Sequence, residues 1–359
     1  MDTTPSTPSQ DEAEEKLFSE LFSLQEQLSA LREAHARRDG ADPLVDDSMP
    51  LKKPIRRLII ASYDLPIAPE VVPNANDKSR LGWNRFLYGP NPAREELAGL
   101  VHLLSSQSSS DYLWVGRLDV NLFESSELQL IQQDLLELHR VIPVFAYGQT
   151  FELHYDGFCK SVLWPLLHSI TPNRMYRSSK EDNVASTWKA YLEVNEAFAQ
   201  QILQVFDPES DVVWIHDYHL FLLPFMIRQQ FPDATIGFFL HTPFCSSEIF
   251  RILPYRKQIL QGMLASDVIG LQTFAYARHF LASCSRILGL TSSPNGVQCE
   301  NGHFAHLRIS PVGIDEKATR VESLSDDVQR RVAELRKEYE GKIVLVGIGK
   351  LAILAVALT

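Results

Sequence analysis

Apolar runs bounded by turn residues alternate with segments of helical spacing from about residue 55 onward. The run RRLIIASYDLPIAP (56–69) ends in turn residues, which is typical of a buried first strand. Apolar positions in the intervening segments recur every three or four residues, as at Leu128, Ile131 and Leu135, which predicts helices. Further strands are predicted at 112–118, 141–147, 211–217, 235–241, 267–273, 306–315 and 343–349, and helices at 126–140, 188–206, 219–231, 246–266, 274–289 and 327–342.

The alternation of strands and helices predicts parallel βαβ units, and therefore an α/β fold with a doubly wound, Rossmann-like sheet. Ligands of such sheets bind beyond the carboxyl ends of the strands. Polar residues that directly follow the predicted strands are therefore the first candidates for a functional site. These are Asp64, Arg117, Asp217, His241 and Asp315.

The N-terminal extension differs in character from the rest of the chain. Residues 1–16 have the composition of a disordered tail, and residues 38–54 that of a linker. Between them, leucines at Leu17, Leu21, Leu24, Leu28 and Leu31 form a heptad seam of about two heptads. This seam fits either a helix docked on its own domain or a helix that pairs with a partner subunit. We therefore divide the chain into an extension (1–54), a Rossmann-like domain (55–340) and the start of a second domain (341–359).

Composition limits the classes of function. A net charge of -11 argues against nucleic-acid binding and requires a local basic cluster for any anionic ligand. The four cysteines are scattered without a CxxC pair, so neither a zinc module nor a disulfide framework is expected, and a reducing, cytoplasmic setting suits them. The N-terminus lacks a secretory signal, and Lys350 interrupts the apolar tail, which favours a buried strand there over a membrane anchor.

Three histidines lie close together in VVWIHDYHLFLLPFMIRQQFPDATIGFFLH (212–241). His216 and His219 are three residues apart and could share a metal, but no Glu or Cys at familiar spacing completes a ligand set. The alternative is favoured: Asp217, at the end of a strand, accepts hydrogen bonds from a hydroxylated ligand. We therefore expect neither a metal nor a cofactor.

Two neighbouring stretches carry further candidates. In FLHTPFCSSEIF, His241 ends a strand and Ser246 or Ser247 caps a helix, whose N-terminus suits an anion; the stretch is equally compatible with plain capping. Arg251 and Arg256 follow within the next turns. In YDGFCKSVLWPLLH, Tyr155 and Trp164 are expected near a loop, either framing a sugar or packing in the core.

Taken together, these motifs resemble the N-terminal half of trehalose-6-phosphate synthase, glycosyltransferase family 20. The resemblance covers about Ile55 to Gly349. It rests on HYDGFCKSVLWPLLH, VWIHDYHLFLLP, GFFLHTPFCSSEIFRILP, YARHFLASCSRILG, PNGV and ISPVGID in this order. It implies the first of the two Rossmann-like domains of a GT-B enzyme that transfers glucose from UDP-glucose to glucose 6-phosphate with retention and without a metal.

The resemblance also implies roles for individual residues. Tyr155 and Trp164 would line the glucose 6-phosphate pocket, Asp217 would contact the acceptor hydroxyls, and His241 would face the transferred glucose. Asp217 and His241 are thus the predicted catalytic residues. Lys350 stands at the position of an arginine that neutralises the diphosphate of UDP.

Several positions depart from the family pattern. Asp64 stands where an arginine normally holds the acceptor phosphate, Arg117 replaces a tryptophan, and Asp156 replaces an asparagine. These changes resemble the non-synthase subunits of the fungal trehalose synthase/phosphatase complex, which serve assembly or regulation. The pattern also breaks after Gly349, so we expect that the given chain lacks the donor domain and is inactive alone, its partners being other subunits of that complex.

Overall fold

The computed structural model describes residues 57–70, 87–90, 111–118, 128–145, 149–170, 181–313 and 316–344. Contacts divide the chain into two units, Met1–Pro311 and Val312–Thr359. The predicted heptad seam, Asp315 and Lys350 lie outside the described residues. The proposed division at residue 340 therefore stays a prediction.

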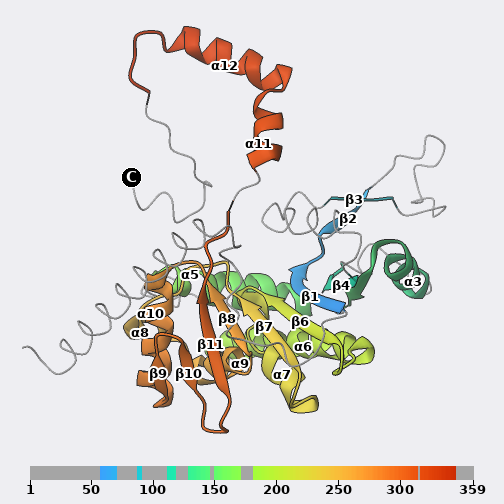
Figure 1. Ribbon diagram of the computed structural model, residues 1–359, viewed down its shortest axis with the longest axis vertical. Helices are drawn as coiled ribbons and strands as arrows, with labels where there is room; N and C mark the ends of the chain where they lie inside the picture. Colours follow the sequence, from blue (N-terminus) through green and yellow to red (C-terminus); the bar gives the residue numbers. More distant parts are fainter. Residues whose placement is uncertain are drawn as a thin grey trace, which may run out of the picture. The chain divides into compact units, whose positions relative to one another are not determined.

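The first unit is built on a sheet that has nine strands within the described part of the chain, in the order β5-β4-β1-β6-β7-β8-β11-β10-β9 (Figure 1). The strands from β5 to β11 are parallel to their neighbours, and β10 and β9 are added antiparallel. The strands are β1 (Arg57–Asp64), β4 (Asp111–Arg117), β5 (Val141–Val144), β6 (Asp211–His216), β7 (Thr235–Phe239), β8 (Val268–Leu271), β9 (Thr291–Ser293), β10 (Gly296–Gln298) and β11 (Phe304–Ile309); β2 (Ile67–Glu70) and β3 (Leu87–Pro90) form a separate antiparallel pair.

The strand order confirms the predicted doubly wound fold. From β1 the chain proceeds outward through β4 to β5, and then returns to place β6 on the other side of β1. The direction of winding thus reverses between β1 and β6. In open α/β sheets such a switch point leaves a crevice at the carboxyl ends of the two strands, where ligands bind.

Helices connect the strands of the first unit, and two further helices form the described part of the second. In the first unit these are α3 (Leu128–His139), α4 (Thr150–Glu152), the π-helical η3 (Leu153–Leu163), α5 (Trp164–Leu167), α6 (Glu181–Val205), the short 3₁₀ turn η5 (Tyr218–Leu220), α7 (Leu223–Gln230), α8 (Ser247–Phe250), α9 (Arg256–Leu264), α10 (Phe274–Ser283) and the π-helical η6 (Cys284–Leu288). The second unit contains α11 (Glu316–Ser323) and α12 (Asp326–Glu338).

Both faces of the sheet are covered, because alternate residues of β1 enter different cores. Ile59, Ala61 and Tyr63 belong to the larger core, which also contains apolar side chains of η3 and α6. Ile60 belongs to a smaller core with Trp114 of β4 and the α3 residues Ile131 and Leu135. The period of two along the strand explains this division, since successive side chains point to opposite faces.

Three sequence-based expectations are wrong in detail. The stretch that carries Tyr155 and Trp164, expected near a loop, is itself helical and spans η3 and α5. The helix predicted at 246–266 is two helices, α8 and α9, separated around Pro254. Finally, Ile343 and Val344 lie in no strand and are 95% and 51% exposed, so the predicted buried strand does not begin there.

The described helices include none that is both long and apolar enough to cross a membrane. All four cysteines lie among the described residues as free thiols. Cys159, Cys245 and Cys284 are buried, and this burial raises their pKa values, that of Cys245 to about 12. These three thiols are therefore packed as small apolar groups rather than poised as nucleophiles.

Replacing Gly262 with alanine is expected to destabilise the first unit. A Cβ atom at Gly262 of α9 would lie 2.3 Å from the backbone oxygen of Phe221, which a side-chain rotation cannot relieve. Alanine gains about 1 kcal/mol of helix propensity, but overpacking against backbone costs about 1–3 kcal/mol or more. We expect a net loss of about 2 kcal/mol in urea unfolding. Gly237→Ala is the matched control, because its Cβ would meet Trp214 at an ordinary 3.4 Å; equal stability of the two variants would contradict the prediction.

Candidate functional site

The candidate site lies at the carboxyl ends of β1, β4, β6 and β7 (Figure 1). Asp217 directly follows β6, as predicted, with φ 70° and ψ 170°, a conformation that non-glycine residues rarely adopt. Its N–H donates to the carbonyl of Phe239 at 2.8 Å, and its carbonyl accepts from the N–H of Leu220 at 3.2 Å. The strained backbone is therefore fixed between β7 and η5.

The Asp217 carboxylate connects two other candidate residues. Its Oδ1 accepts the backbone N–H of His241 at 3.3 Å, and its Oδ2 lies 3.6 Å from Nδ1 of His219. Only 9% of Asp217 is exposed. The structure thus brings together Asp217 and His241, the two residues that the sequence predicts as catalytic.

A pair of histidines lies beside this carboxylate. Nδ1 of His216 is 3.0 Å from Nε2 of His241, and the His241 carbonyl accepts a hydrogen bond from the side-chain amide of Gln272. Burial, together with the neighbouring His241, lowers the pKa of His216 to about 3, so His216 is neutral at physiological pH. The His216 contact therefore helps to orient the half-buried His241 ring without adding a charge.

A stack of aromatic rings includes His219, the neighbour of the Asp217 carboxylate. The ring of Tyr63 stacks on His154 at 5.0 Å, on Tyr155 at 5.0 Å and on His219 at 4.9 Å between centroids. Burial raises the pKa of Tyr63, and within the described residues its hydroxyl has no hydrogen-bond partner. Sequence reasoning singled out Tyr155 but not this stack, because Tyr63, His154 and His219 come from separate segments and only the fold places them together.

Trp164 lies apart from the stack. It opens α5, and its ring stacks on His168 at 3.9 Å, one helical turn further along. Tyr155 lies in η3, whose π-helical backbone is of a kind often found near functional sites. The two aromatic residues predicted to share a pocket therefore have different immediate ring partners, and their joint role as a sugar platform stays a prediction.

Asp64 and Arg117 form an ion pair at the ends of β1 and β4, with Nε of Arg117 3.3 Å from Oδ1 of Asp64. The guanidinium also lies over the rings of Tyr63 and Phe151, at 5.2 and 5.5 Å from their centroids. The Asp64 carboxylate thus already balances the charge of Arg117. An incoming phosphate would compete with Asp64 for Arg117 and would be repelled by Asp64 itself.

Within the part of the chain that the structure describes, no three His, Cys, Asp or Glu residues are grouped so as to hold a metal ion. The polar groups that are present, namely a carboxylate, imidazoles and aromatic faces, are suited to hydroxyl groups and sugar rings.

Comparison with known proteins identifies the family of the chain. Residues 90–355 match the model of glycosyltransferase family 20. The chain is 40% identical over 295 residues to alpha,alpha-trehalose-phosphate synthase [UDP-forming] A of Dictyostelium discoideum, covering 82% of this chain and 37% of that protein. It is also 40% identical over 260 residues to the 56 kDa subunit of the UDP-forming synthase of Kluyveromyces lactis, covering 70% of this chain and 51% of that one.

A solved structure of the N-terminal domain of Candida albicans trehalose-6-phosphate phosphatase has a TM-score of 0.66 and 29% identity, covering 84% of this chain and 58% of that one. The chain therefore spans between about a third and about three fifths of the length of these three proteins. The family match itself covers most of the sequence, including the strand ends that carry Asp217 and His241. The chain belongs to glycosyltransferase family 20.

Proposed function

We propose that this chain acts in trehalose biosynthesis as the acceptor-side domain of a trehalose-phosphate synthase-type protein. The observation that carries the proposal is the Asp217 carboxylate, held in a strained backbone at the switch point of the sheet and bound to the backbone N–H of His241. A fixed, largely buried carboxylate is suited to accept hydrogen bonds from sugar hydroxyls, and an adjacent imidazole is suited to face the transferred glucose.

The substrates follow from the family. The relatives are named UDP-forming trehalose-phosphate synthases. UDP-glucose is accordingly the proposed donor and glucose 6-phosphate the proposed acceptor of the complete protein. In this proposal Tyr155, Trp164, Asp217 and His241 contact the sugars, and Lys350 contacts the donor diphosphate.

A second candidate is a non-catalytic regulatory or scaffold subunit of a trehalose synthase/phosphatase assembly. The Asp64–Arg117 ion pair favours it, because a carboxylate stands where the acceptor phosphate is expected. The likeness to the N-terminal domain of the Candida albicans phosphatase points in the same direction. The subunit name of the Kluyveromyces lactis relative supports an assembly but not a non-catalytic role, because that relative is named as a synthase. In this role the other subunits are the partners, and the heptad seam at 17–31 is the proposed contact.

Release of UDP from UDP-glucose and glucose 6-phosphate, combined with a test of subunit binding, separates the two candidates. The assay uses the purified 359-residue chain, alone and with a complete family member as the positive control. Turnover by the chain alone would contradict the scaffold role. Absence of turnover is expected of either candidate, because the chain spans only part of the length of its relatives. Co-elution with the synthase and phosphatase subunits on a sizing column would support the scaffold role, and lack of co-elution would contradict it.

Changing Asp217 to asparagine is expected to weaken binding of glucose 6-phosphate by about tenfold or more, since hydrogen bonds to charged groups contribute about 1.5–3 kcal/mol. Asparagine has nearly the same shape as aspartate and keeps an oxygen that can accept the backbone N–H of His241, so the fold should persist. Calorimetric titration measures the effect. Asp233→Asn, an exposed position after α7, is the matched control. If wild type shows no binding at millimolar concentration, or if both variants bind like wild type, the acceptor role of Asp217 is wrong.

A further inference from the structure

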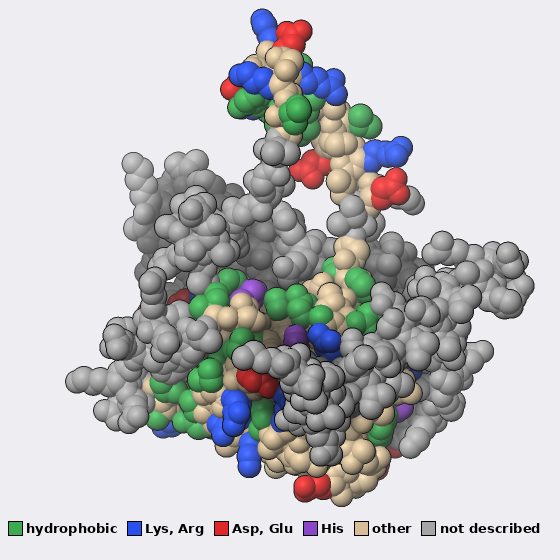
Figure 2. All heavy atoms as spheres, turned by 90° about the vertical axis from the view of Figure 1, so that its left-hand side faces the viewer, with side chains coloured by type: hydrophobic (Ala, Val, Ile, Leu, Met, Phe, Trp, Pro, Cys, Tyr) green, Lys and Arg blue, Asp and Glu red, His purple; other side chains and the backbone are tan. Residues whose placement is uncertain are grey.

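A concave region lies outside the residues of the candidate site. It has a volume of about 230 Å³ and is lined by Ser247, Glu248, Arg251, Arg256, Lys257, Arg286 and Ile287. These residues come from α8, α9 and η6 and from the segment between α8 and α9. Figure 2 shows the side of the molecule that carries α8 and α10, where lysine and arginine side chains gather on the lower part of the face.

An interruption of the helix between α8 and α9 makes this arrangement possible. Arg251 and Arg256 are five residues apart, so in one continuous helix they would point about 140° away from each other. Because α8 ends at Phe250 and α9 begins at Arg256, the two side chains instead line one pocket. Arg256 is further anchored by a hydrogen bond from Nη1 to the carbonyl of Leu253 at 3.1 Å.

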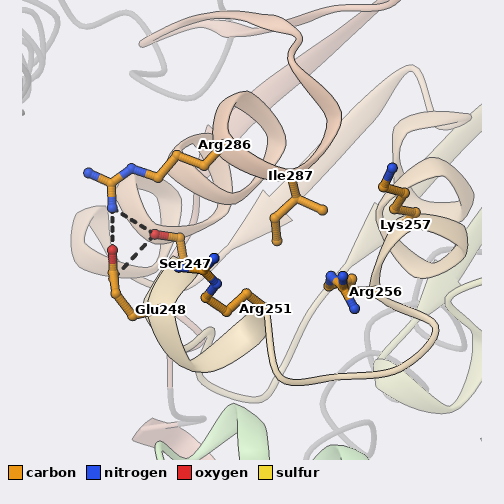
Figure 3. A pocket seen from close by; sticks show the side chains of 7 residues that line it. All are labelled: Ser247, Glu248, Arg251, Arg256, Lys257, Arg286 and Ile287. Atoms are coloured by element: carbon orange, nitrogen blue, oxygen red, sulfur yellow. Dashed lines mark hydrogen bonds and ion pairs between the residues drawn. The ribbon is translucent and has the colours of Figure 1, made fainter.

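The charge of the lining is strongly positive for so acidic a chain. Four cations surround the pocket, with Glu248 as the single carboxylate among its lining residues. Arg286 binds Glu248 and also donates to Oγ of Ser247 at 3.0 Å, so the carboxylate is already neutralised (Figure 3). The other three cations of the lining make no ion pair with any residue that the structure describes. Like charges brought together in a cavity repel one another, and a bound anion relieves that repulsion.

We propose that this pocket binds a small phosphorylated molecule. A pocket of about 230 Å³ is smaller than the roughly 300–1,000 Å³ of typical ligand pockets, which suits one or two phosphate groups rather than an extended polymer. Arginine forks and lysine ammonium groups are the side chains that proteins use for phosphate oxygens. The site is separate from the proposed acceptor crevice, because Tyr155, Asp217 and His241 are not among its lining residues.

The test measures binding of inorganic pyrophosphate to the full 359-residue chain by calorimetric titration in a phosphate-free buffer. The pocket variant is Arg251→Gln with Lys257→Gln, two exposed side chains whose loss should not disturb folding. The matched control is Arg336→Gln with Lys337→Gln, which removes the same charge from exposed positions of α12 in the second unit. We expect saturable binding by wild type and the control, and a weakening of about tenfold or more in the pocket variant.

Further titrations separate the two sources of the phosphate group and the two sites. Glucose 6-phosphate and glucose are titrated into wild type, the pocket variant and Asp217→Asn. Sugar phosphate binding that is lost in the pocket variant but retained in Asp217→Asn would identify an organic phosphate as the ligand; pyrophosphate binding without sugar phosphate binding at this pocket would identify an inorganic one. Absence of saturable pyrophosphate binding, or an equal loss in the α12 control, would overturn the proposal and leave the acceptor site untouched.

Discussion

Replacing Asp211 with alanine is expected to lower the free energy of unfolding by about 3 kcal/mol. The Asp211 side chain is 1% exposed and receives two hydrogen bonds from Arg57, at 3.1 and 2.6 Å, and one from the backbone N–H of Asp207 at 2.8 Å. The pair also raises the pKa of Arg57, mainly through the hydrogen bond to Asp211. Removing the carboxylate leaves a partly buried cation and a backbone donor without their partner.

The register of the sheet supplies a matched control for Asp211→Ala. Arg57, the first residue of β1, is paired with Asp211 on β6 and with Asp111 on β4. Asp111 instead forms an exposed ion pair with Arg140. The Arg140 side chain is 53% exposed and the Asp111 side chain is 60% exposed. Such pairs contribute about 0–1 kcal/mol, so Asp111→Ala should change stability by about 0.5 kcal/mol or less. Urea unfolding of both variants measures the difference, and equal losses would show that burial of the carboxylate does not decide the effect.

Acidification from about pH 7.5 to about pH 5 is expected to remove about 4 kcal/mol of stability through two buried histidines. Burial lowers the pKa of both His154 and His216 from an ordinary value of 6.5 to about 3. Below about pH 6.5 the unfolded chain therefore binds a proton at each of these histidines, while the folded chain binds none. Stability consequently rises with pH across this window and is lost as the pH falls, by about 1.4 kcal/mol per unit for each group.

Two substitutions isolate this acid effect from the titration of other groups. His154→Gln keeps a side-chain nitrogen near the His219 carbonyl, which His154 Nε2 contacts at 3.1 Å, and His216→Asn keeps a polar atom near His241. Each single variant should remove about half of the dependence of the free energy of unfolding on pH, and the double variant should remove most of it. The measurement is the urea midpoint at several pH values, with the stability at about pH 7.5 as each variant's own reference. If the urea midpoint falls equally with pH in wild type and in the double variant, these two histidines do not cause the loss of stability in acid.

The sequence by itself determined the class of fold and the position of the central candidate. Apolar runs alternating with helical segments predicted the parallel sheet, because strand and helix periods are local properties of the chain. Asp217 and His241 were identifiable because each follows an apolar run, and ligand sites in these sheets lie beyond strand ends. The family motifs added the proposed chemistry of those positions.

Tertiary structure decided which distant residues meet. His216 and His241 are 25 residues apart, and Asp64 and Arg117 lie on different strands, so only strand pairing could bring them into contact. The break between α8 and α9 had a local signal in Pro254, which the apolar spacing of 246–266 outweighed in the prediction of a single helix. What the sequence did not show is that Arg251, Arg256 and Arg286 line one pocket. Periodicity reports which face of an element is buried, but contacts between elements depend on how the elements pack, and no local pattern encodes that.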